Sequence, residues 1–452
     1  MYSEQILAVL KKMKVKVGDR VNVTKGKEIF EGVLMPRIEV GDQDTLSIKL
    51  NSGYNVGLRF DRSVNIERVG DGPKLGSIPA LKLKESKELP SISMISTGGT
   101  IGTHVDYKTG GVFMCRSPEE ILSTAPEIQS IVNLKNIIRP FTLASEDMLP
   151  SDWQKMAELS AKELNKDVEG IIITHGTDVL HYTSYAMSFM LKNLTKPIAI
   201  VGAQRSPDRG SFDGAMNLIC AAHFIGHSDV AEVCVVMHGS SNDDYCLAHR
   251  GTKVRKMHTS RRDAFRSIND IPLLKIWPNG KIETLNSNYR KKSKGKVVAD
   301  TKFEPKVSLV KAYVGSDPEI IDWHVKRGFK GIVVEGTGLG HVPTGESGIT
   351  KDPLRKKYSW IPHIKSAVDS GVAVVMTSQA MYGRVNPYVY RNLRLASNAG
   401  TIFGEDMLPE AAYVKLGWVL GHTKNLKKVR ELMAQNLAGE INKRLDTDLF
   451  LI

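Results

Sequence analysis

Hydrophobic residues follow two different periods along this chain. Between residues 20 and 70 they alternate with polar residues in short runs, such as Val21-Asn-Val23 and Leu46-Ser-Ile48, and turn-forming residues separate these runs. This spacing predicts short strands with one buried face. We therefore expect residues 1–75 to form a small β-barrel domain of the SH3-like or OB-like kind. Such a domain serves equally well as an RNA-binding or docking module and as a structural appendage.

From residue 91 onward, apolar residues come in continuous runs, with helical patterns between them. The runs are Ser91–Ser96, Gly170–Thr174, 197–201, 232–237, 307–313, 331–334 and 372–376. Strands that are apolar on both faces are typical of a buried parallel sheet. The predicted fold class is therefore α/β, a two-domain body with parallel sheets that follows a small SH3-like β-barrel.

Changes in composition suggest where these domains begin and end. A lysine-containing stretch over 76–90 is expected to be a linker to a first α/β domain over 91–290, which carries the candidate catalytic residues. A second linker over 291–306 leads to a second α/β domain over 307–452. The basic residues near the second linker are more typical of a solvated connection than of an RNA contact.

Composition narrows the class of protein. The chain has 452 residues, of which 41% are hydrophobic, so it can bury sizeable cores. It lacks an apolar run of about 18 residues, and its beginning lacks the layout of a secretory signal. Its four cysteines form no C-x-x-C pair, so we expect a cytoplasmic protein without a disulfide framework or a membrane span. The net charge of +13 favours a polyanionic partner, but leaves RNA binding open.

The candidate chemistry lies where two buried runs end. Thr97-Gly-Gly-Thr100 follows the first run, and His175-Gly-Thr-Asp178 follows the second, where a helix is expected to begin. Carboxyl ends of parallel strands share one edge, where open α/β folds bind ligands. A threonine hydroxyl becomes a nucleophile only when a base removes its proton, and Lys256 is a candidate because burial lowers the pKa of a lysine. Asp178 could steady that lysine or simply cap the helix.

Other motifs carry less weight. Gly336-Thr-Gly-Leu-Gly340 lacks the complete spacing of a dinucleotide-binding turn. His223 and His227 are spaced like metal ligands on a helix, but no third ligand accompanies them, so helix packing is favoured. There is no G-x-S-x-G elbow either. We therefore expect no metal and no cofactor on this chain.

Four motifs together resemble the bacterial-type L-asparaginase family, from about residue 91 to the C-terminus. They are Thr97-Gly-Gly-Thr-Ile101, His175-Gly-Thr-Asp178, Val201-Gly-Ala-Gln-Arg205 followed by Asp213-Gly214, and Lys256-Met-His-Thr259. Ordinary asparaginases lack the N-terminal barrel. With it, the chain is similar to the D subunits of archaeal glutamyl-tRNA(Gln) amidotransferases.

The resemblance implies roles for individual residues. Thr100 matches the family's nucleophile, and a second catalytic group consists of Thr177, Asp178 and Lys256. Ser145 matches a residue that holds the substrate α-carboxylate, while Asp178 also faces the α-ammonium.

Two positions need separate comment. Glu146 stands where asparaginases commonly have glutamine, and its carboxylate suits an ammonium group better than an amide does. The mobile-loop tyrosine of the family is matched best by Tyr107, although its spacing from Thr100 is short.

The resemblance implies a glutaminase subunit that supplies ammonia for converting Glu-tRNA(Gln) to Gln-tRNA(Gln). It further implies a tRNA-binding partner, the E subunit of the amidotransferase, that holds ATP and Mg²⁺, and a homodimer of this chain within a heterotetramer. Two alternatives are a free-standing L-asparaginase and a non-catalytic RNA-binding scaffold. The complete set of Thr100, Thr177, Asp178 and Lys256 argues against the scaffold.

Overall fold

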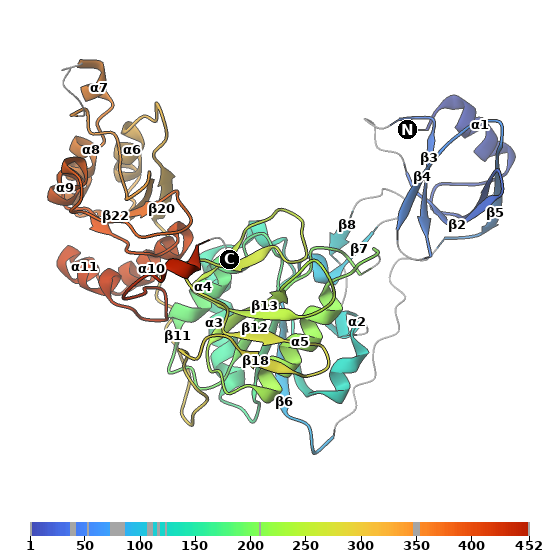
Figure 1. Cartoon of the computed structure of the whole chain (residues 1–452), viewed down its shortest axis with the longest axis horizontal. Helices are drawn as coiled ribbons and strands as arrows, with labels where there is room; N and C mark the ends of the chain where they lie inside the picture. The colour runs from blue at the N-terminus through green and yellow to red at the C-terminus, as the bar shows by residue number, and fades with distance from the viewer. Residues whose placement is uncertain are drawn as a thin grey trace.

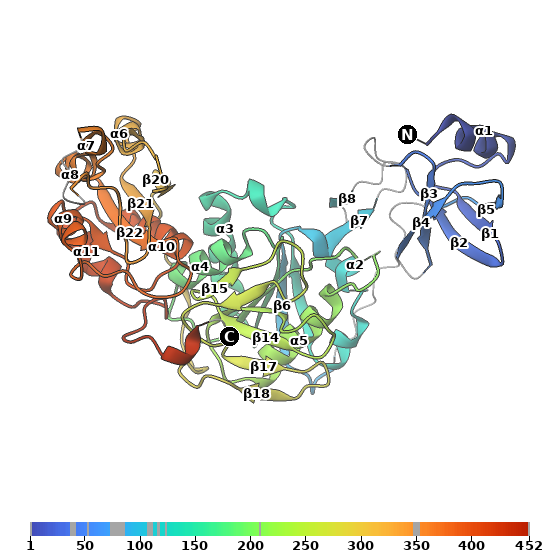
Figure 2. The ribbon, with the colours of Figure 1, turned by 45° about the horizontal axis from the view of Figure 1, so that its top comes forward.

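Three bodies follow one another along the chain in this computed structural model, with the central one between the other two (Figures 1 and 2). The described residues are 2–36, 42–51, 54–72, 86–105, 112–114, 118–122, 124–207, 209–346 and 353–450. The first body is an antiparallel sheet, and the other two contain parallel sheets flanked by helices. The predicted fold class is therefore confirmed. Tyr107, Cys115 and most of the expected 76–90 linker lie outside the described residues.

The N-terminal domain is a five-stranded antiparallel sheet in the order β4-β3-β2-β1-β5, preceded by helix α1. The bounds are α1 (Glu4–Lys12), β1 (Arg20–Lys25), β2 (Glu28–Leu34), β3 (Thr45–Leu50), β4 (Asn55–Arg59) and β5 (Val64–Gly70). Val21, Val23, Leu46 and Ile48 face one core together with Ile6 of α1. The period of two predicted this arrangement, because alternate side chains of a strand share a face.

The central domain is built on an eight-stranded sheet in the order β18-β17-β14-β13-β12-β10-β6-β9. The strands are β6 (Ser91–Ser96), β9 (Asn133–Ile138), β10 (Gly170–Thr174), β12 (Ile198–Val201), β13 (Val233–His238), β14 (Cys246–Arg250), β17 (Leu274–Ile276) and β18 (Ile282–Thr284). The five strands from β9 to β13 are parallel, and four of them are the apolar runs of the sequence. The antiparallel strands β14, β17 and β18 extend the sheet at one side.

Helices cover both faces of this sheet. Ile171 and Ile173 of β10 pack toward α3 and α4, whereas Ile172 packs toward α5 on the other face. The helical segments are η1 (Thr100–Gly102), α2 (Pro118–Leu122), η2 (Pro126–Ser130), η3 (Ser145–Asp147), α3 (Pro150–Leu164), α4 (Leu180–Met190) and α5 (Gly214–His227). Short strand pairs complete the domain: β7 (Thr103–Val105) with β8 (Val112–Met114), and β15 (Val254–Lys256) with β16 (Phe265–Ser267).

The expected second linker is held against the central domain. Its strand β19 (Val298–Ala299) pairs with β11 (Leu191–Lys192). In the basic stretch before it, the Lys291 ammonium lies 2.9 Å from the Asp229 carboxylate, and Lys292 Nζ donates to the Ile225 carbonyl. These cations are therefore engaged by the protein itself.

The C-terminal domain contains a four-stranded parallel sheet in the order β20-β21-β22-β23. Its elements are β20 (Val307–Lys311), α6 (Glu319–Lys326), β21 (Gly331–Gly336), α7 (Pro353–Lys357), α8 (Ile361–Asp369), β22 (Ala373–Ser378), α9 (Arg391–Asn398), β23 (Ile402–Phe403), α10 (Pro409–His422), α11 (Leu426–Ala434) and η4 (Thr447–Leu449). Helix α10 packs on α4, so one hydrophobic core spans both α/β domains.

Polar contacts also join the two α/β domains. The buried Lys253 ammonium lies 2.6 Å from the Asp406 carboxylate. The tail after α11 returns to the central domain, where Thr252 Oγ1 donates to the Ala438 carbonyl and Asn442 Nδ2 donates to the Asn269 carbonyl. No helix in the described part of the chain combines the length and apolar character that crossing a membrane requires. Three cysteines, Cys220, Cys234 and Cys246, are buried free thiols.

Candidate active site

Two strand ends bring the two threonine turns together. Strands β6 and β10 are parallel neighbours that end level with each other, and Thr97 donates both its N–H and its hydroxyl to the Thr174 carbonyl. A Cβ on Gly99 would lie 2.3 Å from the amide nitrogen of Gly176. Glycine is therefore required for this approach, and its φ of +83° is in the left-handed region. Thr100 and Thr177 directly follow the two glycines of this contact.

Thr100 begins the short turn η1 at the carboxyl edge of the sheet and is partly exposed. The turn is fixed from within, because the Thr103 hydroxyl donates to the Thr100 carbonyl over 2.7 Å. The next residue, Ile101, is fully buried in the core beneath. The backbone of Thr100 is therefore held while its side chain lies near the surface.

Lys256 connects the second turn to the end of β15. Its ammonium donates to Thr177 Oγ1 over 2.9 Å and to Asp178 Oδ1 over 2.7 Å. The Lys256 side chain is 10% exposed and that of Asp178 is 65% exposed, so the charge pair is open to solvent on one side. The three residues of the predicted second catalytic group are thus in contact, although their roles remain predictions.

Asp178 does not cap a helix. The sequence predicted that Thr177-Asp178 begins one, but α4 begins at Leu180 with Val179 at its N-cap. The Asp178 carboxylate is bound by Lys256 instead. Of the two roles that the sequence left open for Asp178, contact with the lysine is therefore the one found in the structure.

His175 supports this turn, although no role for it is predicted from the sequence. It is fully buried, with Nδ1 2.7 Å from the Gly176 carbonyl and Nε2 2.8 Å from Thr183 Oγ1. Because a carbonyl can only accept, Nδ1 carries the proton and Nε2 accepts from the Thr183 hydroxyl. Burial lowers the pKa of His175 to about 4, so the ring is neutral near pH 7. Its position inside the His-Gly-Thr-Asp motif was the available signal.

Gln204 is a second residue that was quoted in a motif without a role. The Thr177 hydroxyl lies 3.4 Å from Gln204 Oε1, to which it donates. The carboxylate of Asp213 accepts from the amides of Gln204 and Arg205 over 2.9 and 3.0 Å. Burial raises the pKa of Asp213. The loop after β12 is therefore tied to α5 at one end and meets the second threonine at the other.

Ser145 and Glu146 lie beside the same turns. Ser145 is buried, and a Cβ on Gly176 would lie 2.8 Å from its Oγ. Both residues line a cavity of about 310 Å³ together with Tyr182 and Tyr413. This volume is at the small end of the range for ligand sites. Ser145 thus contacts the backbone just before Thr177, whereas the lining of this cavity includes neither Thr100 nor Thr177 nor Lys256.

The other candidate motifs form no comparable site. Nδ1 of His223 lies 3.2 Å from Nδ1 of His227, and Nε2 of His223 lies 3.2 Å from the Pro278 carbonyl. Within the described ranges, no three histidine, cysteine, aspartate or glutamate residues gather closely enough to hold a metal ion.

Family comparisons divide the chain in a similar way. The family model described as Asparaginase, N-terminal, matches residues 91–290, and that of the Glutaminase/Asparaginase C-terminal domain matches residues 306–433. The model of the GatD N-terminal domain matches residues 15–69. Together with the site, these matches define an asparaginase-type amidohydrolase with an additional N-terminal domain.

Curated relatives and solved structures narrow the class further. The D subunit of glutamyl-tRNA(Gln) amidotransferase from Thermococcus kodakarensis is 52% identical over 96% of each chain, and that from Pyrococcus furiosus is 51% identical over 98% of this chain and 99% of its own. The chain belongs to this family of glutamyl-tRNA(Gln) amidotransferase D subunits. The structure of the T. kodakarensis L-asparaginase is 29% identical with a TM-score of 0.68, and covers 78% of this chain and 100% of its own. L-asparaginase I of Vibrio cholerae is 30% identical with a TM-score of 0.66, over 78% of this chain and 99% of its own.

Proposed function

We propose that this chain is the glutaminase subunit of a tRNA-dependent amidotransferase and supplies ammonia for converting Glu-tRNA(Gln) to Gln-tRNA(Gln). The relatives that match over nearly their whole length are named as D subunits of such an amidotransferase. The observation that carries the chemistry is the contact of Lys256 with Thr177 and Asp178, on a turn whose backbone touches that of the Thr100 turn.

Thr100 is the proposed nucleophile of the first step. Its Oγ forms a bond to the side-chain amide carbon of glutamine, the carbon–nitrogen bond breaks, and the hydroxyl proton passes to the leaving nitrogen, which departs as ammonia. Backbone N–H groups near Gly99 and Thr100 are the candidates for stabilising the oxyanion, at roughly 3 kcal/mol for each donor.

Water completes the second step. It attacks the ester carbon, the bond to Thr100 Oγ breaks, glutamate leaves, and the proton that the water loses restores the Thr100 hydroxyl. We assign the activation of this water to Thr177 and Lys256, which share a hydrogen bond. In its neutral form the Lys256 amine takes the Thr177 hydroxyl proton, and Thr177 Oγ1 takes a proton from the water. Ser145 is proposed to hold the substrate α-carboxylate, and Asp178 and Glu146 to face the α-ammonium.

The receiving half of the reaction is assigned to a partner. We propose a tRNA-binding E subunit that holds ATP and Mg²⁺, activates the misacylated glutamyl ester and receives the ammonia. tRNA contacts are made mainly through this partner, and two copies of the present chain form a homodimer within a heterotetramer. The reaction is placed in the cytoplasm.

The experiment is to purify the chain with its native companion and measure ammonia release from glutamine and from asparagine. We expect turnover of glutamine to rise when Glu-tRNA(Gln) and ATP are added. Preference for asparagine, with no effect of tRNA or of the companion, would favour a free-standing asparaginase. This alternative is suggested by a solved L-asparaginase whose whole chain matches 78% of this one. No ammonia from either amide would favour the scaffold.

A further inference from the structure

The N-terminal domain contacts the loop that follows β12. Tyr54 Oη lies 2.5 Å from Ser211 Oγ, and a Cβ on Gly210 would lie 2.4 Å from the tyrosine ring. The backbone carbonyl of Tyr54 accepts from the amide of Leu50, which ties the tyrosine to β3. In both ribbon views, the hairpin β7-β8, which continues from η1, extends on the side of the central domain that faces the N-terminal domain (Figures 1 and 2).

From Ser211 the contact continues inward along two routes. Phe212 packs against the core cluster that contains Ile101, and both side chains lie within 3.1 Å of a Cβ built on Gly214. Ile101 directly follows Thr100. One residue further on, Asp213 holds the amides of the segment that places Gln204 at Thr177. The segment 210–213 thus connects Tyr54 with both threonine turns.

The contact between Gln204 and Thr177 is weaker than that between Lys256 and Thr177. Ser211 has a φ of +60°, which is unfavourable for a residue other than glycine. The Thr177–Gln204 hydrogen bond is long, at 3.4 Å, and Gln204 Nε2 is buried without a hydrogen-bond partner among the described residues. The Gln204 side chain is therefore held weakly, and a contact between Tyr54 and Ser211 can change its position through Asp213.

We propose that Tyr54 is a positioning residue for the hydrolysis of glutamine. Docking of the N-terminal domain through Tyr54 holds the segment 210–213, and that segment holds Gln204 beside Thr177 and Phe212 beside the Thr100 turn. Hydrolysis then depends on the position of the N-terminal domain. This domain lies outside the asparaginase-like part of the chain, which begins at residue 91. This inference rests on the proposed function.

The test compares two Tyr54 variants in the full chain, purified with its companion. Tyr54→Ala removes both contacts and is expected to lower kcat for glutamine about tenfold, since small displacements at a catalytic group have large effects. Tyr54→Phe removes only the hydroxyl and should give a smaller loss. KM should stay within about twofold, because the proposed substrate-binding residues are not on this segment. The matched control is Ile29→Ala, at an exposed position of the same domain, which should keep the wild-type kcat.

A double-mutant cycle separates positioning from a general structural effect. Gly210→Ala inserts a methyl group into the space of the tyrosine ring, at a backbone φ that alanine tolerates. It should lower kcat in the wild type but have no further effect in the Tyr54→Ala background. Amide exchange at Gln204 and Arg205 should quicken in Tyr54→Ala and not in Ile29→Ala.

Three results would overturn the inference. They are wild-type kcat in both Tyr54 variants, equal effects of Gly210→Ala in the two backgrounds, and unchanged amide exchange at Gln204. In each case the wild-type complex would still hydrolyse glutamine, so the proposed function would stand. A wild-type complex that releases no ammonia would contradict the proposed function itself.

Discussion

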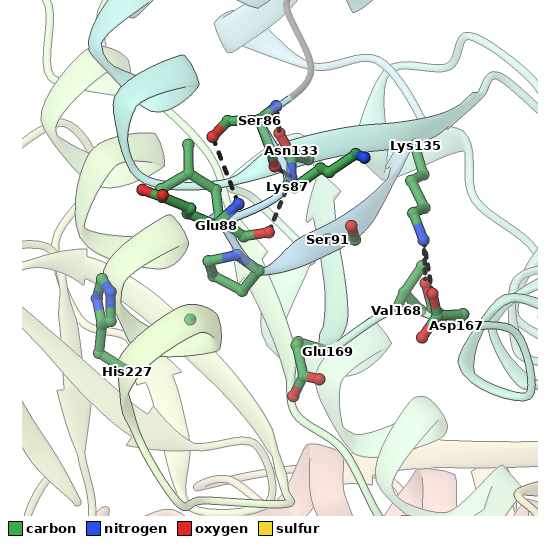
Figure 3. A pocket seen from close by; sticks show the side chains of 13 residues that line it. Ser86, Lys87, Glu88, Ser91, Asn133, Lys135, Asp167, Val168, Glu169 and His227 are labelled. Atoms are coloured by element: carbon green, nitrogen blue, oxygen red, sulfur yellow. Dashed lines mark hydrogen bonds and ion pairs between the residues drawn. The ribbon is translucent and has the colours of Figure 1, made fainter.

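The two ends of the central parallel sheet differ in what their polar groups do. At the amino end lies a cavity of about 870 Å³, lined by Asn133, Lys135 and Asp167 among others (Figure 3). At the carboxyl end the cavity that contains Ser145 has only about 310 Å³. Yet the threonine turns and Lys256 are at the carboxyl end, where α/β sheets bind ligands. The larger cavity is therefore not the one beside the proposed catalytic residues.

The hydrogen bonds and ion pairs of these polar groups explain why the two ends of the sheet differ. At the amino end, Asn133 Nδ2 donates to the carbonyls of Ser86 and Leu89, and Lys135 pairs with Asp167 over 2.8 Å. These bonds fix the chain where it enters β6. At the carboxyl end, Lys256 is bound to the Thr177 hydroxyl and to the largely exposed carboxylate of Asp178, as the proposed proton transfer and substrate binding require. Predictions can test this contrast from both ends.

The largest expected effect is that of Thr100→Val. Removing the proposed nucleophile should lower glutamine hydrolysis by about a thousandfold or more while the fold is retained, since no other hydroxyl is assigned to attack the amide. Ammonia release and the circular dichroism spectrum are the measurements, with Thr124→Val as a matched control. Near-normal ammonia release from the Thr100 variant would remove this residue from the mechanism.

Next comes Lys256→Ala, with an expected loss of about a hundredfold in kcat that raised pH does not restore. The amine is needed at the Thr177 hydroxyl, and hydroxide in solution cannot take its position. A pH series of ammonia release between about pH 7 and 9.5 is the measurement. Full activity of this variant at any pH in the series would contradict the assigned role.

Acid should destabilise the domain that holds the site. Because the pKa of buried His175 is about 4 when folded and 6.5 when exposed, the unfolded chain binds the proton more readily below pH 6.5. Stability is therefore lost as pH falls from about 6.5 through 4, by roughly 3 kcal/mol for this residue. Urea unfolding at several pH values should show a shallower loss in His175→Asn. An identical slope in that variant would show that His175 does not titrate in this way.

Smaller effects are expected at the amino end. Asn133→Ala should lower the free energy of unfolding by about 1 to 3 kcal/mol, because it removes the three hydrogen bonds that this buried side chain makes to the backbone of Ser86 and Leu89. Lys135→Ala, whose partner Asp167 is fully exposed, should change it by less than about 0.5 kcal/mol. Glutamine hydrolysis should be normal in both. A large loss of activity in either variant would mean that this cavity takes part in function.

Local patterns predicted some elements and not others. Strands β6, β10, β12 and β13 were predicted because both of their faces are buried, which makes the runs continuously apolar. The outer strands β17 and β18 were not identified, since each is only three residues long and carries a polar residue, Lys275 or Glu283. A strand this short is defined by its neighbour in the sheet rather than by its own sequence.

The site shows the same division. Each turn could be predicted from glycines next to a threonine. Lys256, however, lies 79 positions from Thr177, so its contact with Thr177 could be expected only from the family resemblance. Gln204 and Tyr54 had no role in the sequence analysis, because their contacts depend on how a loop folds back across the sheet edge. No local period encodes such a contact.

The returning tail has a mechanical consequence for the two α/β domains. The chain leaves the central domain once, after β19, and its tail beyond α11 comes back to that domain, so one covalent connection and the hydrogen bonds of the tail join the two domains. Rotation of one domain about this connection would strain the hydrogen bonds of the tail and the buried Lys253–Asp406 ion pair. The shared core, this ion pair and the tail thus all resist rotation of one α/β domain against the other.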